Sequence, residues 1–239
     1  MKQLFIIIFL LGNIVNICLA DDKLDSLKSI SNFENDSLEI TTYFEIADVY
    51  YGFHDDDSFG IYANKSYELA KKGTNEYSLA KALRYKGAAF SCKQNTDAAL
   101  FYLNSSLEIF QKLGDSISVA SVYSSLSGVY HDNYLLEKSI SYMLKSLKIY
   151  EKYNKKELMI PLLANLSLSF ARQEEHKKAL NYLQKAYHLF EFEKIQDVKP
   201  RHKAAILCQM ARTFGNLYEQ EEKTNYLDSV YHYANKGLV

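Results

Sequence analysis

The sequence predicts an all-α protein built from stacked antiparallel helix pairs, and three observations support this. First, residues 99–113, ALFYLNSSLEIFQKL, resemble SISYMLKSLKIYEKY at 139–153 and ALNYLQKAYHLFEFE at 179–193. Second, apolar residues recur at three- and four-residue steps, the pattern of one helix face. Third, the 239 residues include only 2 prolines and 9 glycines but 20 tyrosines and 13 phenylalanines. Few helix breakers and much aromatic surface favour helices throughout.

The first element is a predicted signal peptide at residues 1–20. Lys2 supplies a positive start, LFIIIFLLG is an uninterrupted apolar run, and cleavage after Ala20 fits the small residue there. An uncleaved N-terminal anchor is the alternative, although the apolar run is short for a membrane span. A lipid anchor on Cys18 is a further alternative, disfavoured by the bulky Ile17 before it. We therefore expect an exported chain that is periplasmic or associated with the cell envelope.

Residues 21–36, DDKLDSLKSISNFEND, form the next element, and two interpretations stay open. Leu24, Leu27, Ile30 and Phe33 fall on one side of a helix, so the segment could be a short N-terminal capping helix. It could equally be an unstructured leader behind the cleavage site.

Residues 37–239 form the main domain, which we predict to hold five helix-pair repeats. Each first helix ends near an aromatic residue, and these aromatics follow one another at steps of 40, 40, 40 and 44 residues. They are Tyr50, Phe90, Tyr130, Phe170 and Phe214. The predicted repeats cover residues 38–73, 77–113, 117–153, 157–194 and 201–236. We expect the aromatics to fill the wedge between adjacent pairs.

In the three middle repeats a small residue follows the aromatic nine places later, where the two helices of a pair would cross. These residues are Ala99, Ser139 and Ala179. A large side chain there would force the helix axes apart, at a cost of about 1–3 kcal/mol. In the first repeat, Ala63 comes four residues later relative to Tyr50. This predicts a turn with four extra residues.

The pattern resembles the tetratricopeptide repeat (TPR). In that family the first helix carries a large residue, then Leu, then Gly or Ala, then an aromatic residue. The second repeat has Leu83, Lys86, Gly87 and Phe90 at these places. The match covers roughly residues 38 to 236. The resemblance implies a right-handed superhelical solenoid whose first helices line an extended concave face.

The sequence also departs from the TPR pattern. Its period of 40 residues exceeds the family's usual length of about 34. Lys86, Lys223 and Val230 stand at places where the family has apolar or small residues. The second and fifth repeats therefore fit the family least well.

The sequence indicates no chemistry. It contains no HExxH pair, GxSxG elbow, Gly-rich phosphate loop or CxxC pair, so we predict no enzymatic activity, no metal and no cofactor. HDDD at 54–57 lacks the spacing of a calcium loop and is interpreted as a solvated acidic turn. KALRYK at 81–86 is interpreted as a solvated basic helix face rather than a phosphate site. A net charge of −1 gives no reason to expect nucleic acid.

What remains is a surface for a protein or peptide partner. The resemblance places Asp48, Lys81 and Gln209 among its concave positions, and it gives a predicted set of peptide contacts. That set is Phe44, Tyr51, Arg84, His131, Asn165, Arg172 and Arg212. The arginines suit carboxylates, unless they face solvent or pair with neighbouring glutamates. Asn165 stands where related repeats hold a peptide backbone. The chaperone-type carboxylate clamp is matched only there, so that ligand is not predicted.

Two functional interpretations follow. The first is a non-catalytic exported scaffold that binds a protein or peptide segment in its concave groove. The alternative is the periplasmic sensor portion of a membrane-bound signalling or transcriptional regulator whose output module is missing from this chain. The apolar residues of the last helix, among them Tyr226, Val230 and Tyr231, also suggest self-association through that helix.

Overall fold

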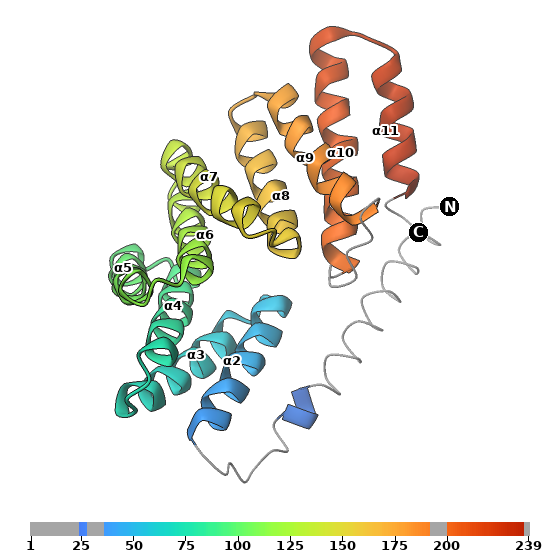
Figure 1. Ribbon diagram of the computed structural model, residues 1–239. Coiled ribbons are helices and arrows are strands. Elements are labelled where there is room, and N and C mark those ends of the chain that lie inside the picture. Colours follow the sequence, from blue (N-terminus) through green and yellow to red (C-terminus); the bar gives the residue numbers. More distant parts are fainter. Residues whose placement is uncertain (1–23, 28–35, 192–199, 237–239) are drawn as a thin grey trace. The chain divides into compact units, whose positions relative to one another are not determined.

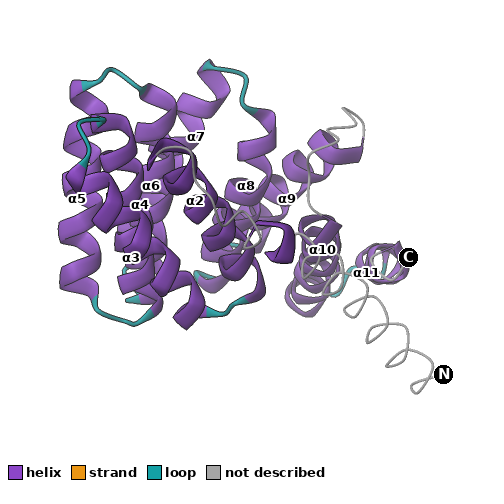
Figure 2. Ribbon diagram, turned by 90° about the horizontal axis from the view of Figure 1, so that it is seen from below, coloured by secondary structure: helices purple, strands orange, loops and turns teal. Residues whose placement is uncertain are grey.

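The computed structural model describes residues 24–27, 36–191 and 200–236. The predicted signal peptide at 1–20 and most of the leader at 21–36 lie outside the described residues. Residues 24–27 are helical and Leu24 is buried. Helices are the sole regular structure in the described ranges (Figure 2). No helix among them is both long and apolar enough to cross a membrane.

The chain divides into two compact units between Leu113 and Gly114. The N-terminal unit contains two helix pairs, and Figure 1 shows neighbouring helices running antiparallel within it. Its helices are α2 (Asp36–Phe53), α3 (Asp56–Lys72), α4 (Glu76–Cys92) and α5 (Thr96–Lys112). One core cluster of this unit joins α2, α3 and α4 around Phe44, Phe59 and Tyr85.

The C-terminal unit contains three further pairs, which end in the hairpin of α10 and α11 (Figure 1). Its helices are α6 (Ser116–Asp132), α7 (Leu136–Lys152), α8 (Lys156–Arg172), α9 (His176–Glu191), α10 (Pro200–Glu221) and α11 (Asn225–Lys236). One apolar cluster runs through all six of these helices. In both units the predicted all-helical stack of antiparallel pairs is confirmed.

The turns inside the first four repeats share one backbone conformation. Each has a residue in the left-handed region just before the second helix, and these residues are 40 positions apart. They are His54, Gln94, Tyr134 and Glu174. The next residue caps the second helix in two repeats: Asp55 accepts from the Ser58 amide at 3.0 Å, and Asn95 from the Ala98 amide at 3.1 Å. The acidic HDDD stretch therefore forms a turn and a helix cap.

The longer turn predicted for the first repeat is wrong. Helix α3 begins at Asp56, 40 residues before α5 begins at Thr96, so the two helices are in register. Phe59 then occupies the place of Ala99, and Ala63 the place of Leu103. The large residue therefore comes before the small one in this repeat, the reverse of the second repeat. The small residue Ala63 then matches Ala99 only if the first repeat is shifted by one helical turn.

The two helices of a pair approach closely where the sequence has small residues. In α4 and α5, Ala99 is fully buried, and a Cβ atom added to Gly87 would lie 2.7 Å from Leu103 Cγ. Buried serines on second helices also bond to first-helix carbonyls. Ser106 Oγ donates to Ala80 O at 2.7 Å, and Ser146 Oγ donates to Ala120 O at 2.9 Å. These contacts leave no room for a larger side chain.

Every repeat contains a pair of aromatic rings stacked face to face. In each case one ring comes from the first helix and the other from the second helix of the same pair. The stacked pairs are Tyr50–Tyr62, Phe90–Tyr102, Tyr130–Tyr142, Phe170–Tyr182 and Phe214–Tyr233, with centroids 5.3 to 5.7 Å apart. The aromatics were predicted to fill wedges between pairs. Their stacking partners instead lie within one pair, so this detail is corrected.

The structure accounts for two departures from the family pattern. Lys86 is 13% exposed, and its Nζ lies 3.8 Å from the Tyr67 ring centre and 3.7 Å from a Glu68 carboxylate oxygen. The rings take the place of water around a cation at a core position. In the fifth repeat, Lys223 precedes α11 and pairs with Glu221 at 2.6 Å. Lys223 is therefore a turn residue and does not take part in the packing between the two helices.

We expect Gly87→Ala to lower the free energy of unfolding by about 1–2 kcal/mol, because the new methyl group collides with Leu103 and the Ala99 carbonyl. Gly128→Ala is the matched control, since a Cβ there meets nothing within 4 Å. The control should raise stability by up to about 1 kcal/mol through helix propensity. Urea unfolding followed by circular dichroism measures both. Shifts of equal sign would contradict the close approach of α4 and α5.

We expect Lys86→Ala to lower the free energy of unfolding by about 2 kcal/mol, because the side-chain stem that fills the space beside Tyr67 is lost. Lys86→Met should stay within about 1 kcal/mol of the wild type, since its thioether packs against the same rings. Thermal and urea unfolding measure both variants. A Met variant as unstable as the Ala variant would show that the charge, and not the packing, is what matters.

Candidate peptide-binding surface

All seven residues predicted to contact a peptide lie on first helices of the repeats. The N-terminal unit carries Phe44 and Tyr51 on α2 and Arg84 on α4. The C-terminal unit carries the others: His131 on α6, Asn165 and Arg172 on α8, and Arg212 on α10. Because the two units are separate bodies, each surface is described within its own unit.

Phe44 lies beneath the surface of the N-terminal unit. Its ring is 4% exposed and packs against Tyr85, with ring centres 4.9 Å apart. Lys81 covers it, with Nζ 4.4 Å from the ring centre. Phe44 is therefore a buried ring that supports the ammonium group of Lys81. Tyr51 is 54% exposed, and its ring packs on buried Phe59.

Arg84 belongs to a small polar group that joins α4 to α2. Its guanidinium carbon lies 4.7 Å from the centre of the Tyr85 ring. The Tyr85 hydroxyl donates a hydrogen bond of 2.7 Å to Asp48. Burial raises the pKa of the Tyr85 phenol against the opposing effect of Arg84, so the hydroxyl keeps its proton and donates it. No pattern in the sequence points to Tyr85, which is buried and directly follows the predicted contact Arg84.

Lys81 lies beside Arg84 on the same side of α4. Burial lowers the pKa of the Lys81 amine, and the nearby Arg84 charge lowers it further, while Asp48 and Glu45 act in the opposite direction. Neither Lys81 nor Arg84 forms an ion pair with a carboxylate of the described residues. The solvated basic face predicted for KALRYK is therefore wrong, because both cations rest on aromatic rings and are half-buried.

The C-terminal unit exposes three of its predicted contacts. Asn165, Arg172 and Arg212 are exposed on α8 and α10. Neither arginine forms an ion pair with another described residue. The buried residues of α8 include Leu162 and Ser169, one helical turn before and after Asn165. Packing therefore uses most of this first helix and leaves the Asn165 amide and the Arg172 guanidinium as exposed polar groups.

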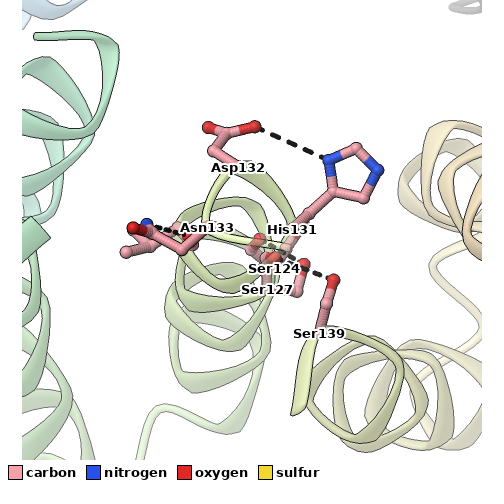
Figure 3. Close-up of polar contacts among 7 residues, drawn as sticks. Ser124, Ser127, His131, Asp132, Asn133 and Ser139 are labelled. Atoms are coloured by element: carbon pink, nitrogen blue, oxygen red, sulfur yellow. Dashed lines mark hydrogen bonds and ion pairs between the residues drawn. The ribbon is translucent and has the colours of Figure 1, made fainter. Parts of the chain in front are cut away.

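His131 is placed differently from the arginines. Its side chain is 20% exposed, and Nδ1 lies 3.5 Å from Asp132 Oδ1. Its Nε2 atom is buried and has no hydrogen-bond partner among the described residues. Figure 3 shows the imidazole and the Asp132 carboxylate projecting together from the last turn of α6. The serine hydroxyls nearby bond to backbone carbonyls, with Ser139 Oγ donating to Ser127 O at 2.8 Å.

Gln209 resembles His131 in one respect. Its side-chain carbonyl oxygen lies on the predicted concave side of α10 and is buried, with no hydrogen-bond partner in the part of the chain that the structure describes. No group of three or more His, Cys, Asp or Glu residues that could hold a metal occurs in the described part of the chain. The candidate surface thus consists of amides, cations and aromatic rings, a composition suited to holding a chain segment.

Comparison with known proteins agrees with the repeat geometry. Residues 118–191 match the family model described as a tetratricopeptide repeat. No curated protein matches the chain. The chain has the tetratricopeptide-repeat fold.

Solved structures extend the comparison over most of the TPR array. A kinesin light chain-like protein of Podosopora anserina with TPR-like repeats has a TM-score of 0.61 at 15% identity, covering 85% of this chain and 98% of its own. A Rap protein complexed with Competence and Sporulation Factor scores 0.63 at 14% identity, covering 90% and 68%. The Rap conjugation gene regulator of plasmid pLS20, in complex with the Phr* peptide, scores 0.65 at 14% identity, covering 96% and 71%. At these identities the likeness concerns the fold.

Tyr85→Phe should lower the free energy of unfolding by about 1 kcal/mol, because it removes the hydrogen bond that ties α4 to Asp48 on α2. Tyr77→Phe is the control, since Tyr77 is 47% exposed and packs through its ring against Phe110. We expect the control to change stability by less than about 0.5 kcal/mol. Urea unfolding distinguishes them, and equal effects would argue against a structural role for the Tyr85 hydroxyl.

Proposed function

We propose that this chain is a non-catalytic repeat scaffold that binds an extended protein or peptide segment along the exposed side of its first helices. One observation carries the proposal: Asn165, Arg172 and Arg212 remain exposed on α8 and α10, and neither arginine has an ion-pair partner among the described residues. Two Rap proteins, one complexed with Competence and Sporulation Factor and one in complex with the Phr* peptide, support it by analogy of fold.

The chemistry of these side chains suits a polypeptide. A primary amide such as that of Asn165 offers both a donor and an acceptor, which a peptide bond can satisfy together. A guanidinium such as Arg172 or Arg212 binds a carboxylate through two parallel hydrogen bonds. In TPR arrays an extended surface allows several such weak contacts to act on one segment.

We further propose that the chain is exported, with cleavage after Ala20, on the basis of the signal-like sequence at residues 1–20. N-terminal sequencing of the protein from its native source tests this. A mature chain that begins at Asp21 is expected, and a mature chain that retains Lys2 would contradict it.

Self-association through α11 is a second proposal, and it rests on the exposure of that helix. No residue of α11 is fully buried, and Tyr231 is 68% exposed. Sedimentation of the wild type and of Tyr231→Ser tests the idea: a dimer that dissociates in the variant is expected, and a wild-type monomer at all concentrations would refute it.

The main proposal is tested with a partner captured from the native envelope fraction, identified by mass spectrometry and then purified. The combined variant Asn165→Ala, Arg172→Ala, Arg212→Ala should raise the dissociation constant by at least roughly 10-fold, since such contacts carry much of the energy of an interface. Titration calorimetry measures it. The matched control removes one amide and two cations from exposed places on second helices, through Asn181→Ala, Lys148→Ala and Lys152→Ala.

The control should change the dissociation constant by less than about 2-fold. Equal weakening by both combined variants would show that general charge, and not the first-helix surface, holds the partner. No weakening in either would place the binding site elsewhere.

A further inference from the structure

Lys81 and Arg84 are two neighbouring cations that form no ion pair with a carboxylate of the described residues. They lie three residues apart on α4, which puts them on one side of the helix. Each rests on an aromatic ring, Lys81 on Phe44 at 4.4 Å and Arg84 on Tyr85 at 4.7 Å. Both side chains are half-buried, so water screens their mutual repulsion less than it would at a fully exposed site.

The acidic groups nearest to this pair do not close an ion pair with it. Asp48 accepts the hydrogen bond of the Tyr85 hydroxyl, and Glu45 is exposed one turn earlier on α2. Both act on Lys81 from a distance. Lys86, on the same helix, shows the contrasting case, because Glu68 lies 3.7 Å from its ammonium group.

We propose that Lys81 and Arg84 form a subsite for one side-chain carboxylate, Asp or Glu, of the bound peptide. This inference rests on the proposed function and names a part of its specificity. The rings of Phe44 and Tyr85 hold the two cations in place before binding, which reduces the entropy lost when a carboxylate arrives. Arg84 offers a planar fork of donors and Lys81 a compact charge, so one carboxylate can accept from both.

Asp and Glu carboxylates are the anions that an unmodified peptide supplies, so a carboxylate is the occupant proposed for this subsite. Tyr51 lies on the same helix as Asp48 and is exposed, with its ring packed on Phe59. It offers an apolar surface. A peptide with an acidic residue near an apolar one fits this chemistry.

The probe is a displayed library of random 12-residue peptides, selected on the full chain. We expect the selected peptides to share an Asp or Glu. In the strongest peptide, exchanging that residue for Gln or Asn should weaken binding to the wild type by roughly 10-fold. The same exchange should weaken binding to the double variant Lys81→Gln, Arg84→Gln by less than about 2-fold. The charge-preserving variant Lys81→Arg, Arg84→Lys should retain the preference, which separates charge from folding.

The control variant Lys71→Gln removes an exposed cation from α3 and should leave the preference unchanged. If exchanging the acidic residue of the peptide weakens binding to the wild type and to the double variant by the same factor, the subsite alone is overturned. Selection of no peptide would overturn the proposed function and the subsite with it. A phosphoserine analogue that binds more tightly than the Glu peptide would overturn the assignment of a carboxylate.

Discussion

The close approach of the two helices within each pair is the constraint on which the rest of this structure depends. Between α4 and α5 the approach is so close that one added methyl group at Gly87 would touch Leu103 at 2.7 Å. Stacked rings such as Phe90 and Tyr102 fill the remaining width of the pair. This packing leaves Asn165, Arg172 and Arg212 exposed on first helices of the C-terminal unit, whereas on first helices of the N-terminal unit Phe44 is buried and Lys81 is half-buried.

The repeat period could be predicted from sequence because it is a property of the chain alone. Helices α3, α5, α7 and α9 begin 40 residues apart, as the self-similar segments require. The partners of individual side chains could not be predicted in the same way. Phe59 is large where the second repeat has Ala99, and Ala63 is small where it has Leu103. A match based on small residues therefore places the first repeat one helical turn too late. Periodicity identifies a helix face, but it does not say which ring that face will meet.

The candidate surface was predictable in position and less so in exposure. The family resemblance placed its residues on first helices, where the structure has them. Yet Phe44 is buried in a core cluster with Tyr85 and under the Lys81 side chain, and Asn165 is exposed beside buried Leu166. Long cationic side chains cover apolar neighbours according to the local geometry of the rings. That geometry depends on contacts between α2 and α4, which no single stretch of sequence contains.

Helix α4 shows how the same kind of residue takes two roles within six positions. Lys86 points to one side, where Tyr67, Tyr102 and Glu68 surround its charge and make it part of the core. Lys81 points to the other side, where a ring supports it but no carboxylate closes on it. A ring holds the position of a cation, and only an anion neutralises its charge. The side of α4 where no carboxylate of the described residues forms an ion pair is therefore the side where a partner's carboxylate would gain most.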